Sequence, residues 1–184
     1  MQTAVYYFPN FHVDPRNEAV HGKGWTEWEL MKHAGPRFPG HMQPKIPAWG
    51  YEDEADPAVM AKKIDAAADH GLDAFIFDWY WYEGPFLERA LNEGFLGAPN
   101  RSRMKFALMW ANHDWKNFHP GNRDTGNYKI TFPWTTRKDT IPYVWDYLIE
   151  HYLTQPNYWK INGKPYFSIY AISRFISQMG GVED

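Results

Sequence analysis

The 184-residue sequence contains no cysteine, which excludes disulfide bonds, thiolate zinc sites and cysteine nucleophiles. It also has no excess of positive charge. Its 19 Lys and Arg residues against 22 Asp and Glu residues give a formal net charge of -3, so we expect no nucleic-acid partner. No apolar run approaches the roughly 18 residues of a membrane-spanning helix, and no signal peptide is visible before residue 4. We therefore expect no membrane partner and a cytoplasmic location.

Aromatic residues, in contrast, are abundant. The chain has 10 Trp, 12 Tyr and 12 Phe, which make up 18% of its residues. Trp and Tyr combine a flat apolar face with a polar group, which suits stacking on sugar rings or on bases. Because the net charge is negative, a sugar is the better candidate ligand. An aromatic-rich core would give the same composition, so the positions of these residues have to decide.

Short apolar segments alternate with amphipathic ones along the chain. Apolar strands that alternate with helices indicate a parallel sheet with right-handed crossovers. The pattern predicts strands at residues 4–8, 74–80, 105–111 and 166–170. It predicts helices at residues 26–33, 57–71, 86–96, 139–152 and 173–179. Asn162-Gly163 is a strong tight-turn signal just before the last strand.

Two architectures fit this alternation, a doubly wound sheet and a (β/α) barrel. A doubly wound sheet usually carries a glycine-rich phosphate turn after its first strand, and the sequence has no G-x-G-x-x-G. The long polar segments follow strand ends, where barrel enzymes place their sites. We therefore predict an α/β fold, the N-terminal half of a (β/α)8 barrel with about four βα units. It forms one partial domain over residues 1–184, with a long first βα loop at 9–55.

A half-barrel has two open strand edges, which favour association. We expect a partner at these edges, either the C-terminal half of the barrel or a second copy of the chain.

Four clusters of aromatic and polar residues lie where a barrel would place its site. They are YYFPNFH at 6–12, GKGWTEW at 22–28, DWYWY at 78–82 and WANHDW at 110–115. A sugar site needs flat apolar surfaces together with a few hydrogen-bonding groups. Asp78 could instead cap a strand end, and Glu27 could stabilise the first turn of a helix. The candidate substrate-binding residues are Tyr6, Tyr7, Trp25, Glu27, Asp78, Trp79, Trp110, Asn112 and His113.

Asp78 and Glu27 are also the candidate catalytic carboxylates, because glycoside cleavage uses a pair of carboxyl groups. We expect hydrogen bonds to outweigh burial at Asp78, which would keep its carboxylate ionised as an acceptor for sugar hydroxyls. No metal or cofactor is expected. His113, Asp114 and His119 are possible ligands, but they show no tight spacing such as H-E-x-x-H.

The ordered motifs VYYFPNFH, GKGWTEW, GHMQP, FDWYWY and WANHDW resemble the glycoside hydrolase family ninety-nine-like domains. These domains include the WbsX-like proteins of bacterial polysaccharide gene clusters. The resemblance extends over residues 4–170 and implies a (β/α)8 barrel that acts on an oligo- or polysaccharide without a metal or cofactor. The hydrolytic members are endo-acting on α-mannosides and retain the anomeric configuration, whereas the WbsX-like members are often labelled glycosyltransferases.

The sequence departs from the family at one motif. Members usually have W-A-N-E after the third strand, whereas this chain has His113 in place of the carboxylate. The hydrolases carry their catalytic carboxylates in a Glu-Trp-x-Glu-like segment on a later strand, which the resemblance places beyond Asp184. The resemblance therefore predicts no α-mannosidase turnover by these 184 residues alone. It transfers a sugar-pocket role to Tyr6 or Tyr7, Glu27, Asp78, Trp79 and Asn112.

Three functions stay open from the sequence. The first is a glycoside hydrolase-like enzyme to which the chain contributes the sugar-binding half of the site. The second is a glycan-binding protein without turnover. The third is a sugar-nucleotide glycosyltransferase, which ranks last because the chain has neither an Asp-x-Asp motif nor a glycine-rich phosphate turn.

Overall fold

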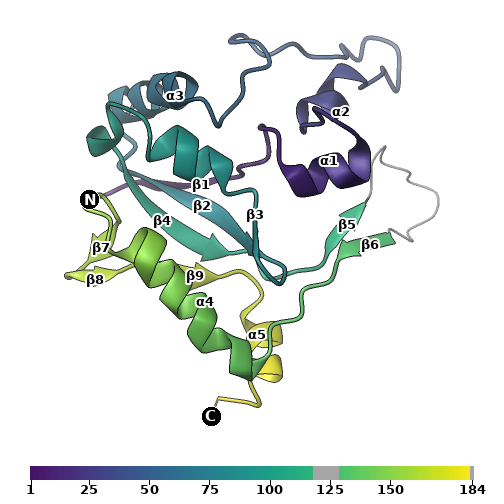
Figure 1. Ribbon diagram of the computed structural model, residues 1–184. Helices are drawn as coiled ribbons and strands as arrows, with labels where there is room; N and C mark the ends of the chain where they lie inside the picture. Colours follow the sequence, from purple (N-terminus) through teal and green to yellow (C-terminus); the bar gives the residue numbers. More distant parts are fainter. Residues whose placement is uncertain (118–128, 183–184) are drawn as a thin grey trace.

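The computed structural model of the chain describes residues 1–117 and 129–182, and its centre is a parallel sheet (Figure 1). Within these residues the sheet has four parallel strands in the order β1-β2-β4-β9. The strands are β1 (Ala4–Tyr7), β2 (Ala74–Trp81), β4 (Lys105–Trp110) and β9 (Phe167–Ile169). All four strands predicted from the apolar segments are thereby confirmed.

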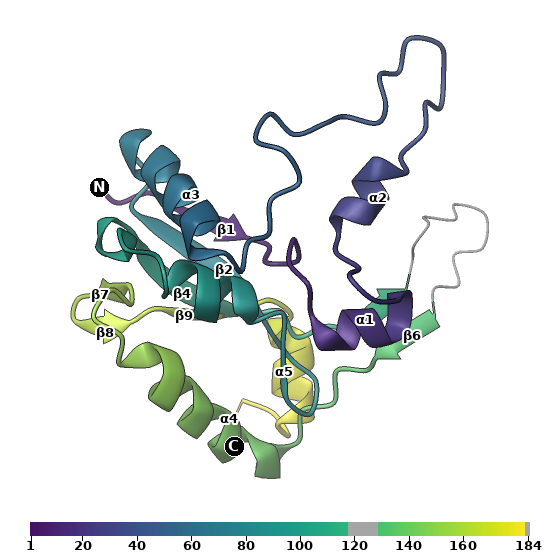
Figure 2. The ribbon, with the colours of Figure 1, turned by 45° about the horizontal axis from the view of Figure 1, so that its top comes forward.

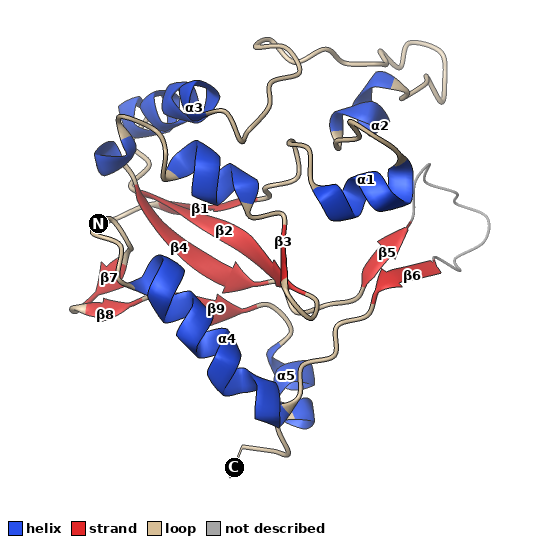
Figure 3. Ribbon diagram, viewed as in Figure 1, coloured by secondary structure: helices blue, strands red, loops and turns tan. Residues whose placement is uncertain are grey.

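The helices that pack on the sheet lie on one of its faces (Figures 1 and 3). The π-helix η1 (Ala90–Phe95) places the ring of Phe95 against Phe75 and Phe77 of β2. Helix α4 (Ile141–Leu148) places Tyr147 against the same face of that strand. In the described part of the chain the opposite face carries no helix. A doubly wound sheet has helices on both faces, so the arrangement is that of a barrel segment, as predicted.

Helix α3 (Pro57–Asp69) begins and ends close to the residues that the capping signals in the sequence predict. The side chain of Asp56 accepts a hydrogen bond from the backbone N–H of Ala58 at 2.8 Å, which satisfies a free donor of the first turn. Met60 and Ile64 are fully buried one turn apart. Gly71 follows the helix with φ of +84°, a left-handed conformation that glycine adopts without strain.

The long first loop contains two helices, α1 (Pro15–His21) and α2 (Trp28–Lys32). The second was predicted, and the first was not. Helix α1 is capped by Asp14, whose side chain accepts hydrogen bonds from the backbone N–H groups of residues 16 and 17. In Figure 2, α1 and α2 lie beyond the ends of the strands, apart from the layer that covers the sheet.

The helix predicted over residues 86–96 is shorter than expected. It is preceded by strand β3 (Pro85–Phe86), which pairs antiparallel with β2. Glu83 and Leu87 have positive φ angles of 55° and 61°, which are incompatible with a right-handed helix. The chain therefore turns back along β2 before η1 begins.

The remaining elements surround the ends of the sheet. Strands β5 (Trp115–Asn117) and β6 (Lys129–Phe132) pair antiparallel in a segment predicted to be irregular. As predicted, Asn162-Gly163 forms the tight turn, here between β7 (Lys160–Ile161) and β8 (Lys164–Pro165). The short helices are η2 (Arg101–Arg103), η3 (Lys138–Thr140), η4 (Ile149–Leu153) and α5 (Ile172–Gln178). Among the described residues, none of the helices combines the length and the apolar character needed to span a membrane.

Strands β1 and β9 form the two edges of the sheet. In the described residues each of them pairs with a single neighbour, β2 and β4 respectively. Both edges are therefore open for hydrogen bonding. Pairing with a second half-barrel, or with another copy of the chain, stays a prediction.

His12 in the first loop is fully buried, and neither of its ring nitrogens has a hydrogen-bond partner among the described residues. Burial lowers the pKa of its imidazole, while the nearby carboxylates of Asp14, Glu54 and Asp53 act in the opposite direction and Arg89 adds to the lowering. The folded state therefore favours the neutral form of His12, whereas the unfolded state takes up a proton as the pH falls below about 6.5.

We expect His12 to contribute a loss of stability between pH 7 and pH 5, so that His12→Leu is more stable relative to the wild type at pH 5 than at pH 7. The contribution of one titrating group is at most about 1.4 kcal/mol per pH unit. Urea unfolding at pH 5, 6 and 7 measures it. The matched control is His33→Gln, because the side chain of His33 is 78% exposed. If the free energy of unfolding of His12→Leu has the same pH dependence as that of the wild type, protonation of His12 does not contribute to the pH dependence of stability.

Candidate functional site

The side chains of β2 alternate between the two faces of the sheet, as they do in every strand. Phe75, Phe77 and Trp79 contact the helix layer. Asp78 and Tyr80 therefore point to the face that has no helices. In the parallel register, Asp78 lies beside Met109 of β4. The open face of the sheet thus presents a carboxyl group and a phenol near the carboxyl end of β2.

A cleft of about 460 Å³ lies at the carboxyl ends of the parallel strands. Its lining includes a residue at the carboxyl end of each of the four strands. Phe8 follows β1, Tyr80 is the last residue but one of β2, His113 follows β4 and Tyr170 follows β9. Barrel enzymes build their active sites at this end. The full lining is Phe8, Tyr80, His113, Asp114, Trp115, Lys116, Tyr170 and Arg174.

Asp78 does not line this cleft, but its side chain hydrogen-bonds with Tyr80, which does, and it is only partly exposed. Burial raises the pKa of its carboxyl group to about 6, and hydrogen bonding with Tyr80 opposes that rise. Its Oδ1 atom is buried and has no hydrogen-bond partner in the part of the chain that the structure describes. The expectation that hydrogen bonds outweigh burial at Asp78 is therefore wrong. The carboxyl group is still mostly ionised at neutral pH, so it remains a hydrogen-bond acceptor.

Glu27 reaches the same region from the first loop. The side-chain amide of Asn10 donates a hydrogen bond of 2.6 Å to the carboxylate of Glu27. The side-chain amide of Asn17 in turn donates a hydrogen bond of 2.9 Å to the side-chain oxygen of Asn10. Burial raises the pKa of Glu27 to about 7, and the bond from Asn10 opposes that rise. Burial also raises the pKa of Tyr80, and the charges of Asp78, Tyr82 and Glu27 add to the effect. The two candidate carboxyl groups therefore lie close to the same phenol.

His113 and Tyr6 are also on this side of the sheet. The ring of His113 stacks on Trp115 and meets Tyr80 and Tyr170 edge to face. Tyr6 pairs with residue 76 in the register of β1 and β2 and is 63% exposed. The structure therefore brings Tyr6, Glu27, Asp78 and His113 to the open side of the sheet.

Three candidate residues, Tyr7, Trp79 and Trp110, lie on the other face, away from the candidates on the open side of the sheet. The hydroxyl of Tyr7 donates to Glu54 at 2.6 Å under the first loop. The indole N–H of Trp79 donates to Glu88 at 2.8 Å. Trp110 is buried between the rings of other core residues. Tyr7 and Trp79 alternate along their strands with the residues on the open face, so their side chains point to the helix-covered face although they are neighbours in sequence.

Asn112 and Trp25 are placed by the structure outside the cleft lining. Asn112 is fully buried, and its side chain both donates to and accepts from the backbone of Ala171, at 3.0 and 2.6 Å. Its side-chain oxygen and nitrogen thereby fasten the end of β4 to the segment after β9, instead of facing a ligand. Trp25 stacks on His21 at the end of α1, with ring centroids 4.2 Å apart.

Several cleft residues are not among those predicted from the sequence. The period-2 alternation of β2 would have selected Tyr80 together with Asp78. The ion pair between Arg174 and Asp114, at 2.9 Å, joins residues 60 positions apart, and no local signal indicates it. Hydrogen bonding to Arg174 lowers the pKa of Asp114, so this carboxylate stays ionised and fixes the Arg174 guanidinium beside Trp134.

The candidate metal ligands do not form a site in the described residues. Across residues 1–117 and 129–182, no three His, Asp or Glu side chains are grouped to hold a metal ion. His119, one member of the candidate set, lies outside the described residues.

Comparison with known proteins supports both the fold and the family. The chain aligns with the GH99 endo-alpha-mannosidase from Bacteroides thetaiotaomicron with a TM-score of 0.50 and 17% identity, over 94% of this chain and 43% of that one. This likeness concerns the fold. The chain is 31% identical over 168 residues to the uncharacterised protein WxcX from two strains of Xanthomonas campestris pv. campestris, B100 and ATCC 33913.

The alignment covers 90% of this chain and 23% of WxcX, so the chain spans about a quarter of the length of these relatives. Residues 3–180 match the protein family described as Glycosyltransferase WbsX. That match includes every motif on which the sequence resemblance depends. The chain therefore belongs to the WbsX glycosyltransferase family.

Proposed function

We propose that this chain provides the sugar-binding part of a glycan-active (β/α)8 barrel, with the cleft at the carboxyl ends of its strands as the binding site. One observation carries the proposal. The Oδ1 atom of Asp78 is buried without a hydrogen-bond partner in the described chain, and the same side chain hydrogen-bonds with Tyr80, which lines the cleft. Burying a carboxylate oxygen unpaired is costly, so a ligand hydroxyl that donates to it would be bound strongly.

The cleft lining and the two carboxyl groups close to Tyr80 fit a pyranose ring in two ways. Rings of Trp115, Tyr170 and Phe8 offer apolar faces for the C–H side of a sugar. Asp78 and Glu27, whose pKa values lie near 6 and 7, offer acceptors that are at least partly ionised at neutral pH. We assign both carboxyl groups to orienting sugar hydroxyls. Arg174 adds a donor that Asp114 already holds in position.

The substrate class that we propose is an oligo- or polysaccharide with α-mannoside-type linkages, cleaved by a retaining, endo-acting barrel. The fold shared with the GH99 endo-alpha-mannosidase supports this choice. Sugar transfer during polysaccharide synthesis is the second candidate, supported by the description of the family. Incubating the whole protein with α-mannosides on one hand, and with sugar nucleotides plus acceptor on the other, separates the two. Binding without either reaction would indicate a glycan-binding protein.

Tyr170 tests the cleft with little risk to the fold, because its side chain is 65% exposed. We expect Tyr170→Ala to weaken binding of manno-oligosaccharides by about 0.5–1.5 kcal/mol, the range for a specific aromatic contact. That corresponds to roughly a 2- to 12-fold rise in Kd. Isothermal titration calorimetry measures it.

The matched control is Tyr143→Ala. Tyr143 is 64% exposed, but it belongs to α4 on the helix-covered side. We expect this variant to bind as the wild type does. If both tyrosine variants bind oligosaccharides like the wild type, or if both weaken binding equally, the cleft is not the sugar site.

A further inference from the structure

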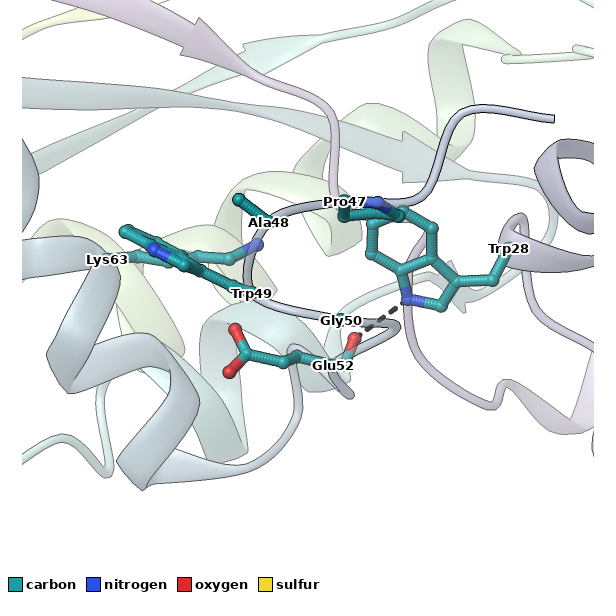
Figure 4. A pocket seen from close by; sticks show the side chains of 7 residues that line it. All are labelled: Trp28, Pro47, Ala48, Trp49, Gly50, Glu52 and Lys63. Carbon is teal, nitrogen blue, oxygen red and sulfur yellow. Dashed lines mark hydrogen bonds between the residues drawn. The ribbon is translucent and has the colours of Figure 1, made fainter. Parts of the chain in front are cut away.

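A second, smaller pocket lies between the first loop and helix α3 (Figure 4). It has a volume of about 280 Å³, and Trp28, Pro47, Trp49, Glu52 and Lys63 contribute to its walls. Among the described residues it shares no lining residue with the cleft at the strand ends. The pocket is therefore a separate feature, and what it binds does not depend on the function proposed for the cleft.

Two indole rings form opposite sides of this pocket, and both are held in place. The N–H of Trp28 donates to the backbone oxygen of Glu52 at 2.8 Å, as the dashed line in Figure 4 shows. The same ring packs on Phe11 and Tyr51. The ammonium group of Lys62 lies 4.4 Å from the ring centroid of Trp49, a favourable cation–π arrangement. Preorganised walls of this kind reduce the ordering cost of binding.

The charged groups around the pocket neutralise one another. Lys62 forms an ion pair with Glu52 at 2.6 Å. Lys63 forms an ion pair with Glu54 and also donates to the hydroxyl of Tyr7 at 3.0 Å. Each ammonium group thus already has a carboxylate, so among the described residues the pocket offers no unpaired charge for a phosphate, a carboxylate or an amine. The ligand that fits is uncharged.

The shape and chemistry of the walls narrow the ligand further. Trp49 is 47% exposed, so much of its apolar surface is open to a ligand. The Glu52 carboxylate, fixed by Lys62, is an acceptor for hydroxyl groups at the edge of that surface. A volume of about 280 Å³ is just below the usual range of small-molecule sites, roughly 300–1,000 Å³, so the pocket suits one ring. We propose that this pocket is a second sugar-binding site that takes one neutral hexopyranose residue of a glycan.

The proposal can be tested by observing the indole rings of Trp28 and Trp49 during sugar binding. The whole 184-residue chain is labelled with 5-fluorotryptophan, and its fluorine spectrum is recorded during titration with the methyl glycosides of mannose, glucose and galactose. Trp49→Phe assigns the Trp49 signal. We expect saturable shifts of the Trp28 and Trp49 signals with at least one of these sugars. Trp145 on α4, which packs against Phe167, is expected to stay unshifted.

Variants connect the shifts to the pocket. Trp49→Ala is expected to weaken the interaction at Trp28 at least about tenfold, because aromatic anchors dominate binding energy. The cleft variant Tyr170→Ala is expected to leave the Trp49 titration unchanged, so failure of the cleft proposal and failure of this one give different results. The wild-type titration does not depend on how well any variant folds.

Two outcomes would overturn the proposal. One is the absence of a saturable shift at Trp49 with all three glycosides up to their solubility limit. The other is a Trp49 signal that responds to a planar aromatic probe, such as phenol, and not to the sugars. The second result would mean that the pocket recognises flat apolar rings and not the hydroxyl groups of a hexose.

Discussion

Glu54→Leu is expected to destabilise the protein by about 3–5 kcal/mol, the cost of breaking one side of a buried ion pair. The Glu54 side chain is 3% exposed, and it forms an ion pair with Lys63. It also accepts hydrogen bonds from the hydroxyl of Tyr7 at 2.6 Å and from the backbone N–H of Phe11 at 3.3 Å. Removing the carboxylate leaves all three donors without it, and Lys63 keeps a mostly buried charge.

Urea unfolding followed by circular dichroism measures this effect. The matched control is Glu93→Ala, because Glu93 forms an ion pair with Arg89 in which both side chains are well exposed. Such a pair contributes about 0–1 kcal/mol. The double variant Glu54→Leu/Lys63→Leu is expected to be more stable than Glu54→Leu alone, since no charge is then left unpaired. Glu54→Leu within 1 kcal/mol of the wild type would show that the ion pair does not anchor the first loop.

The Glu54 cluster illustrates what the sequence could and could not predict. Its acidic surroundings, from Glu52 to Asp56, have the composition of an exposed loop. Burial of Glu54 depends on Tyr7 and Lys63, which come from β1 and α3. Contacts between residues so far apart follow from the packing of the whole domain. For the same reason the pairs Asn112–Ala171 and Asp114–Arg174 were not predicted.

Local signals were reliable where their physical basis is local. Asp56-Pro57 predicted the start of α3, because a side-chain cap and a proline in the first turn act within a few residues. Asp14-Pro15 is the same signal at the start of α1, and it would have predicted that helix inside the first loop. The alternation of β2 would likewise have separated Asp78 and Tyr80 from Trp79. These features were available in the sequence, unlike the long-range pairs.

Asp78→Ala is expected to weaken glycan binding by about 1.5–3 kcal/mol, the range for a hydrogen bond to a charged group. This corresponds to roughly a 10- to 150-fold rise in Kd. Asp78→Asn should retain part of the affinity, because the amide oxygen still accepts a hydrogen bond. Since the pKa of Asp78 is raised to about 6, the charged form of the acceptor is lost by protonation as the pH falls from 7 to 5, and binding should weaken towards that of Asp78→Asn. Calorimetric titration with manno-oligosaccharides at several pH values measures both effects.

Asp78→Asn is expected to stabilise the folded protein, although it weakens glycan binding. Burial raises the pKa of Asp78 above its ordinary value of 3.8, so the folded state favours the protonated form. Above about pH 6 the folded protein carries an ionised carboxylate that it disfavours, and Asp78→Asn removes it. The variant should therefore unfold at a higher temperature than the wild type at pH 7, and this difference should vanish below about pH 4. Asp65 is the control, because its pKa is shifted in the opposite direction to that of Asp78. Hydrogen bonds from Asn100 and Arg103 lower its pKa, so Asp65→Asn should lose stability above about pH 4.

The two readouts together distinguish the roles open to Asp78. A variant that is more stable and binds glycans less well has lost a group kept for function at a cost in stability. A variant that is less stable and binds glycans normally would show that Asp78 holds the end of β2 in place and does not meet the ligand. Robust α-mannoside hydrolysis by the 184-residue chain, abolished by Asp78→Asn, would instead make Asp78 a catalytic carboxylate. That result would move Asp78 from sugar binding to bond cleavage, because an amide accepts hydrogen bonds but can neither ionise nor transfer a proton.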